Sequence, residues 1–181
     1  MVGAIQGEEN PIREINKLAF LHIFVLCSHF IIISYFMEKT LILLKPDTVQ
    51  KSLVGTILAR FEAKGYKVIG LKMMTMSDAL VAEHYDFLAD KPFFPTIQSY
   101  MTSSPIVALA LEGTDVIRGV RSLCGATNPA DATPGTIRGD FAKNIDNNII
   151  HSSDSVETAE KEIARFFATT EIFDYSRPLL G

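Results

Sequence analysis

The chain has little of several residue types, and each shortage excludes a class of site. Among its 181 residues there is no tryptophan, and there are only two cysteines, Cys27 and Cys124. Two cysteines make no disulfide framework, and no group of cysteine and histidine has zinc-site spacing, so a structural metal is not expected. The pair suits a reducing compartment, and we expect a cytoplasmic protein.

A large charge of one sign is also missing. The formal net charge is −4, which argues against bulk nucleic-acid binding, and no specific nucleic-acid partner is expected. The glycine patterns GxxxxGK[ST] and GxGxxG do not occur either. Any bound nucleotide must therefore be held by a few side chains and not by a glycine-rich cradle.

One long hydrophobic run stands near the start of the chain. Residues 18–36 contain no Lys, Arg, Asp or Glu and are numerous enough to cross a bilayer as a helix. The flanking residues do not resemble those of a cleavable signal peptide. Either the run is a membrane anchor, or translation begins at Met37 and residues 1–36 are upstream sequence. The second alternative is favoured, because residues 37–181 read as a domain that needs no preceding segment.

From Met37 onward the hydrophobic periodicity predicts an α+β domain. Strands are expected over 40–45, 66–74, 105–113 and 148–153. Helices are expected over 53–64, 77–89, 96–101, 115–123 and 156–167, the last with a capping box from Asp154 to Glu157. The order predicts a ferredoxin-like βαββαβ fold. Its four-stranded antiparallel sheet would be covered on one face by helices, with a long loop, 127–140, before the last strand.

A single histidine is the first candidate for chemistry. His151 ends the last predicted strand, where its side chain can project into a cleft. Neutral imidazole, with a reference pKa of about 6.5, is a good nucleophile if a partner fixes its orientation. Glu162, Ser153 and Asp154 are near enough in sequence to do so. The alternative is a structural histidine bonded to the helix cap.

Several cations form the second candidate group. Lys45, Arg121 and Arg138, with the hydroxyl of Thr127, match a polyphosphate, because guanidinium groups bind phosphate oxygens in pairs. Ordinary surface salt bridges are the alternative for any one of them. Lys45 is the exception, because a lysine that ends an apolar strand is costly unless it faces a site.

An aromatic pair is the third candidate. Phe93 and Phe94 stand between two prolines, so their backbone is restrained. Either ring could stack on a nucleobase without reading its identity, and the alternative is that both belong to the core.

Taken together, five ordered segments resemble the nucleoside diphosphate kinase family. The resemblance runs over nearly all of residues 40–175, in LLKPD, RFEAKGYKVIGLKM, HYDFLADKPFFP, ATNPADATPGTIRGDF and NNIIHSSDSVETAEKEI. The last segment holds Asn148-Ile-Ile-His151-Ser152-Ser153-Asp154-Ser155, which is similar to the family signature NxxHGSDS.

The resemblance implies an enzyme that moves the γ-phosphate of a nucleoside triphosphate to a nucleoside diphosphate. The mechanism would be ping-pong through a phosphohistidine at His151. Glu162 would hold the imidazole and Ser153 would support that contact. Phosphates would be bound by Lys45, Tyr85, Arg121, Thr127 and Arg138, sugar hydroxyls by Lys45 and Asn148, and the base by Phe93. Mg²⁺ would be carried by the substrate phosphates, with no metal site on the protein.

Departures from the family pattern leave some points open. Ser152 stands where the family usually has glycine, and local backbone geometry could differ there. Thr48 stands where a smaller residue is common, and little effect is expected. The short C-terminal tail is compatible with a homo-tetramer or a homo-hexamer. Two alternative functions remain at this point, a catalytically silent nucleotide-binding regulatory relative and a membrane-tethered form of the kinase.

Overall fold

The computed structural model describes residues 37–177 of the chain. The apolar run over residues 18–36, and the choice between an anchor and upstream sequence, lie outside the described residues. Among the residues that are described, no helix is both long and apolar enough to cross a membrane.

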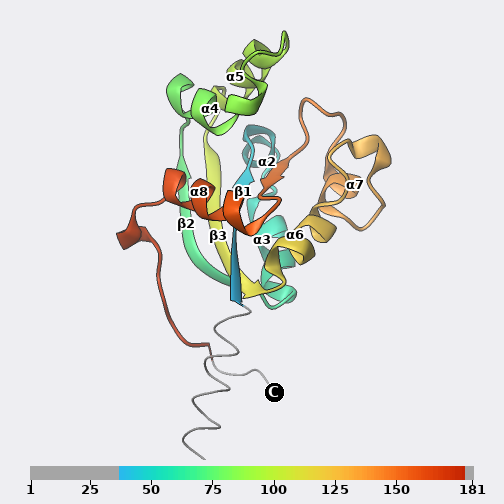
Figure 1. The fold of residues 1–181 in the computed structure, drawn as a ribbon. Coiled ribbons are helices and arrows are strands. Elements are labelled where there is room, and N and C mark those ends of the chain that lie inside the picture. The colour runs from blue at the N-terminus through green and yellow to red at the C-terminus, as the bar shows by residue number, and fades with distance from the viewer. Residues whose placement is uncertain (1–36, 178–181) are drawn as a thin grey trace, which may run out of the picture. The chain divides into compact units, whose positions relative to one another are not determined.

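Four antiparallel strands form one sheet in the order β2-β3-β1-β4 (Figure 1). They are β1 (Met37–Leu44), β2 (Lys67–Met74), β3 (Ile106–Thr114) and β4 (Ile150–Ser152). The two long central strands, β1 and β3, pair along their whole length, and β4 adds only three residues to the edge of β1. The predicted α+β class and four-stranded antiparallel sheet are confirmed.

Helices and short 3₁₀ turns connect the strands. The α-helices are α2 (Pro46–Gln50), α3 (Val54–Ala63), α4 (Asp78–His84), α5 (Phe94–Thr102), α6 (Val116–Cys124), α7 (Ile137–Phe141) and α8 (Val156–Phe166). The 3₁₀ turns are η1 (Asp86–Leu88), η2 (Pro129–Asp131) and η3 (Thr169–Glu171). Ser77 caps α4 as predicted, because its side chain accepts the backbone N–H of Leu80.

Two of these helices were not predicted. The sequence KPD reads as a break, but Pro46 starts α2, because proline suits the first turn of a helix. Within the predicted long loop, the Thr136 side chain accepts the N–H of Gly139 and begins α7.

The expected cap of the last helix was wrong by one residue. Ser155, and not Asp154, is the N-cap of α8, and its hydroxyl accepts the N–H of Thr158 at 3.1 Å. Ser155 has an extended backbone, which aims its side chain at the first turn of the helix.

Helices pack on both faces of the sheet, so the prediction of one covered face was wrong. Ile42 and Leu44 of β1 point to a cluster built mainly with α3 and α6. Leu41 and Leu43 point to the opposite cluster, which includes residues of α4, α5 and α8. Because successive side chains of a strand alternate between faces, an unbroken apolar run such as residues 41–44 is buried on both sides. Figure 1 shows α8 crossing one of these faces.

Candidate active site

A cavity of about 670 Å³ lies at the end of β1 and along β4, and residues of α5, α6 and α8 also line it. Nine of the ten predicted site residues line it, and they come from segments far apart in the sequence. They are Lys45, Tyr85, Phe93, Arg121, Thr127, Arg138, Asn148, His151 and Glu162. The tenth, Ser153, is buried behind Glu162 and is bonded to it.

His151 is oriented by a buried carboxylate. Its Nε2 lies 2.9 Å from Oε1 of Glu162, and the other carboxylate oxygen accepts the Ser153 hydroxyl at 2.5 Å. Burial alone raises the pKa of Glu162, but the hydrogen bonds from His151 and Ser153 outweigh it, so the pKa is lowered. An ionised carboxylate only accepts hydrogen bonds, so Nε2 carries the ring proton and the lone pair remains on Nδ1.

A second histidine, His84, lies against this pair and was missed from the sequence. Its side chain is fully buried, its ring meets the His151 ring edge-on with centroids 4.6 Å apart, and its Nδ1 is 3.8 Å from Glu162 Oε1. Burial, and then the charge of His151, lowers the pKa of His84 to about 3. His84 is therefore neutral near neutral pH and brings no positive charge to Glu162.

At one end of the cavity, Arg138 and Lys45 are hydrogen-bonded to the segment that leads into the His151 strand. Arg138 donates to three main-chain carbonyls, those of Asn148, Gly125 and Ile150, at 3.3, 2.8 and 2.7 Å. Burial is the main reason that the pKa of Arg138 is lowered. The Lys45 ammonium donates to the side-chain oxygen of Asn148 at 2.6 Å. Burial, followed by the charge of Arg138, lowers the pKa of Lys45 to about 8.

The residue two positions before His151 has an unusual backbone. Ile149 has φ +71°, and a β-branched residue rarely adopts this left-handed conformation. The N–H of Ile150 reaches back to the carbonyl of Asn148 at 2.7 Å, which closes a tight three-residue turn around Ile149. Such strain costs about 1–3 kcal/mol and persists only where surrounding contacts impose it.

The opposite end of the cavity is aromatic and exposed. Phe93, the residue before α5, is 50% exposed, Phe87 is 69% exposed, and Ile145 is 58% exposed. Phe94 packs against the core instead. Of the two phenylalanines that the sequence offered for base stacking, the structure therefore leaves Phe93 in the cavity. Ile145 was missed, although a lone isoleucine in the polar run KNIDNN was a usable signal.

Tyr85 lies between the two ends. Its ring centroid is 6.3 Å from that of His151, and its hydroxyl contacts the sulfur of Met101 at 3.9 Å. Burial raises the pKa of Tyr85, so the hydroxyl keeps its proton and donates it to the Met101 sulfur.

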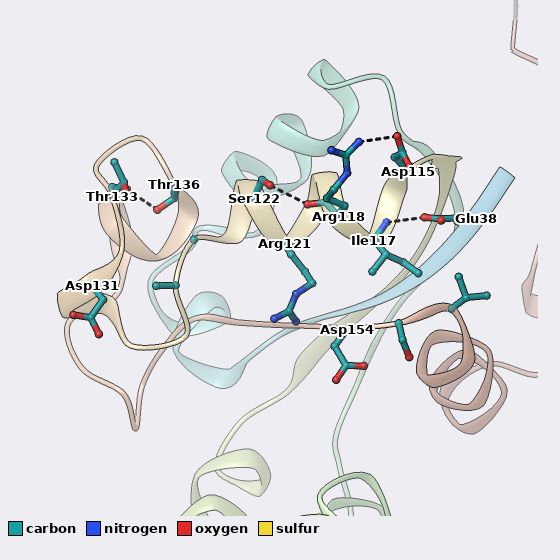
Figure 2. A pocket seen from close by; sticks show the side chains of 14 residues that line it. Glu38, Asp115, Ile117, Arg118, Arg121, Ser122, Asp131, Thr133, Thr136 and Asp154 are labelled. Carbon is teal, nitrogen blue, oxygen red and sulfur yellow. Dashed lines mark hydrogen bonds and ion pairs between the residues drawn. The ribbon is translucent and has the colours of Figure 1, made fainter. Parts of the chain in front are cut away.

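Arg121 lies on the border between this cavity and a neighbouring hollow. Gly125, Ala126 and Asp154 also line both spaces. Figure 2 shows the neighbouring hollow, with Arg121 extending from α6 toward the segment that carries Asp154. Arg121 is exposed, in contrast to Arg138, so it can move toward a ligand in the cavity.

Ser152, the departure from the family signature, fits without disrupting β4. It is buried and pairs with Ile42 of β1, and it lies near the thiol of Cys124. Burial raises the pKa of that thiol to about 11.

Within residues 37–177, one group of side chains has metal-ligating atoms close together, namely His84, His151 and Glu162. Two imidazole nitrogens and one carboxylate are a poor match for Mg²⁺, which prefers oxygen ligands in an octahedron. These three side chains are therefore not a magnesium site of the usual kind.

Comparison with known proteins agrees with this geometry. The profile of the family described as "Nucleoside diphosphate kinase" matches residues 38–172. The chain is 52% identical to the nucleoside diphosphate kinase of Synechococcus elongatus over 140 residues, which cover 77% of this chain and 94% of that protein. It is also 52% identical to human nucleoside diphosphate kinase A over 139 residues, with 77% and 91% covered.

Solved structures give the same result. A halophilic nucleoside diphosphate kinase from Halobacterium salinarum, in complex with CDP, superposes with a TM-score of 0.76 at 46% identity. The alignment covers 77% of this chain and 93% of that one. The chain therefore belongs to the nucleoside diphosphate kinase family, whose enzymes transfer phosphate between nucleotides.

Proposed function

We propose that the phosphate is transferred through a covalent phosphohistidine at Nδ1 of His151. The observation that carries the proposal is the 2.9 Å contact between His151 Nε2 and Glu162, which leaves the lone pair on Nδ1 of a residue that lines the cavity. Nδ1 attacks the γ-phosphorus of a nucleoside triphosphate, an N–P bond forms, and the P–O bond to the β-phosphate breaks. The nucleoside diphosphate leaves, a second one enters, and its terminal oxygen takes the phosphate from Nδ1.

Positive charge and hydroxyl groups at one end of the cavity support phosphate binding there. Lys45, Arg121 and Arg138 neutralise charge on the transferred group and the leaving diphosphate, which is the main requirement of phosphoryl transfer. Tyr85 and Thr127 add hydroxyl donors. Glu162 maintains the ring orientation of His151, and Ser153 fixes Glu162.

The sugar and base would extend toward the exposed end. Asn148 and Lys45, which are bonded to each other at 2.6 Å, would contact sugar hydroxyls. Phe93 would stack on the base, with Ile145 available as a second apolar surface. A CDP complex is known for the Halobacterium salinarum relative, which supports nucleoside diphosphates as ligands of this cavity. Stacking without side-chain hydrogen bonds to the base would admit all the common bases.

Mg²⁺ is the cofactor that this arrangement would use. Bound to substrate oxygens, it would supply charge neutralisation on the phosphates. The protein side chains of the cavity would bind the remaining phosphate oxygens, and Lys45, Arg121 and Arg138 supply the positive charge for this.

Self-association is also part of the proposal, as a homo-tetramer or homo-hexamer. β2 is an edge strand of the sheet, and its Leu71 and Met73 are 54% and 61% exposed. Exposed apolar side chains on an edge strand favour contact with a second chain. Native mass spectrometry of the full chain would give the subunit number, and a monomer would contradict the proposal.

The enzyme domain would be residues 37–181, in the cytoplasm. N-terminal sequencing of the protein from its native cells would test this directly. A mature protein that begins at Met37 and remains in the soluble fraction supports it. A membrane-bound protein that retains residues 18–36 would support the tethered form instead.

Incubation with γ-³²P-ATP and Mg²⁺ tests the mechanism. The wild-type chain should acquire an acid-labile, base-stable label that peptide mapping places on His151, and ADP should remove it. His151→Ala should take up no label and still bind nucleotide. Lys161→Ala is the matched control, because Lys161 is exposed on α8 and, among residues 37–177, forms its side-chain hydrogen bond with Glu157. Label on His151→Ala would place the phosphate on another residue and contradict the proposal. An unlabelled wild type would favour a catalytically silent nucleotide-binding protein.

A further inference from the structure

We propose that Thr48 is a positioning residue for the nucleophile. The proposal rests on the function of His151 proposed above. Thr48 lies in α2, is completely buried, and donates its hydroxyl to the carbonyl of Ile149 at 2.5 Å. The backbone N–H of Lys45 donates to the same oxygen at 2.9 Å. The carbonyl of Ile149 therefore has two donors, and both come from the segment that directly follows β1.

The position of this carbonyl matters because Ile149 is strained. A β-branched residue at φ +71° tends to relax toward an extended backbone, and rotation about its bonds would swing the carbonyl away from α2. The Lys45 bond alone is the ordinary continuation of the β1–β4 ladder, since Leu44 pairs with Ile150. The Thr48 hydroxyl is an additional contact that the ladder does not require. It holds the left-handed conformation in place.

The consequence reaches His151 through two peptide units. A change at Ile149 alters the direction of β4, and with it the place of Nδ1 relative to the phosphate. Phosphoryl transfer depends steeply on such alignment. Phe93 and Arg121 lie on other elements, so nucleotide binding should respond much less than the chemical step.

The sequence alone predicted little effect from Thr48. That prediction considered only the size of the side chain, since the family often has a smaller residue there. A residue without a hydroxyl at this position could not make the second bond to Ile149. In this chain the hydroxyl is thus an added means of fixing the nucleophile strand.

Thr48→Val and Thr48→Ser separate the hydroxyl from the shape of the side chain. Valine keeps the volume and removes the donor, whereas serine keeps the donor. The single-turnover rate of His151 phosphorylation by Mg-ATP should fall about two- to ten-fold in Thr48→Val, the effect of losing one net hydrogen bond. The ATP concentration for half-maximal rate should stay within about two-fold, and Thr48→Ser should retain the wild-type rate. Thr48→Ala is the replacement if the valine variant does not fold.

Several results would overturn the proposal. They are a wild-type rate in Thr48→Val, a serine variant as slow as the valine variant, and a loss confined to ATP affinity. If Thr48→Val lowered the melting temperature but left the rate of His151 phosphorylation unchanged, the Thr48 hydroxyl would have a purely structural role. The His151→Ala variant is assayed in parallel. If it takes up label, the proposed function of His151 is wrong; if it takes up none, a failed Thr48 test concerns only the role of Thr48.

A double-mutant cycle with Ile149→Gly sharpens the test. Glycine adopts positive φ without strain, so the valine substitution should slow phosphorylation less in the Ile149→Gly background than in the wild type. Equal effects in the two backgrounds would mean that Thr48 does not act through the conformation of Ile149.

Discussion

The two ends of the cavity differ in how firmly their side chains are held. At the phosphate end, His151, Glu162, Ser153 and Arg138 are joined to one another or to the main chain by short hydrogen bonds. At the base end, Phe93 projects with half of its surface exposed, and no polar partner fixes its ring.

This difference matches the demands of the two halves of the substrate. In the proposed mechanism the phosphate is the reacting group and must be aligned with Nδ1 to within a fraction of an ångström. The base only needs an apolar surface, because a kinase that serves many nucleotides gains nothing from reading base edges. We therefore expect the rigid end to govern turnover and the open end to govern affinity.

The largest effect is expected from weakening the rigid end at Glu162. In Glu162→Gln the amide can present its NH₂ to His151 Nε2, which would favour the wrong ring tautomer and leave Nδ1 protonated. We expect kcat to fall about 10- to 100-fold, with KM nearly unchanged. Steady-state kinetics with ATP and a second nucleoside diphosphate would measure this. Glu160→Gln, an exposed residue of the same helix, is the control and should behave as wild type.

A smaller effect is expected from pH acting on Lys45. Its pKa is lowered to about 8 in the nucleotide-free protein, so the ammonium loses its proton as the pH rises through 8. Phosphate binding needs the charged form, and kcat/KM should fall by about ten-fold per pH unit well above that pKa. Lys45→Arg keeps its charge throughout this range and should remove the alkaline limb of the profile. An identical limb in Lys45→Arg would assign it to another group.

The smallest effect is expected at the open end. Phe93→Ala should raise KM about three- to ten-fold and leave kcat within about two-fold, since the ring is half exposed and stacking on it is worth little more than 1 kcal/mol. Purine and pyrimidine nucleotides should be affected alike. Phe173→Ala removes another exposed ring, 62% exposed against 50% for Phe93, that does not line the cavity, and it should change neither kcat nor KM. If kcat fell by a larger factor than KM rose, the base end would also affect the chemical step, and the two ends would not have separate roles.

Much of the fold could be predicted because periodicity records burial. The central strands of the sheet were recognisable as runs such as LILL, and α4 by its serine cap. The second covered face was not foreseen, because an apolar run does not say which neighbours will meet each side. The short helices α2 and α7 were missed, since five residues are too few for a periodic pattern.

The site was predictable for a different reason. Lys45, His151 and the two arginines carry ionisable or nucleophilic groups, so each could be picked out as a candidate. The resemblance of the ordered segments to a known family then assigned them to one site. Contacts made by ordinary residues could not be foreseen. Nothing in the sequence shows that the Thr48 hydroxyl meets Ile149, or that His84 lies on the His151 ring, because both depend on how α2 and α4 dock on the sheet.

The three carbonyl contacts of Arg138 have a consequence for substitution at that position. A guanidinium has five N–H groups, and three are engaged with the chain, so two remain for the ligand. Lysine would carry the same charge on one nitrogen with three hydrogens and could not span three carbonyls that belong to two separate segments. Arg138→Lys would thus preserve the charge but break the hydrogen bonds that connect the loop after α6 to the strand that carries His151.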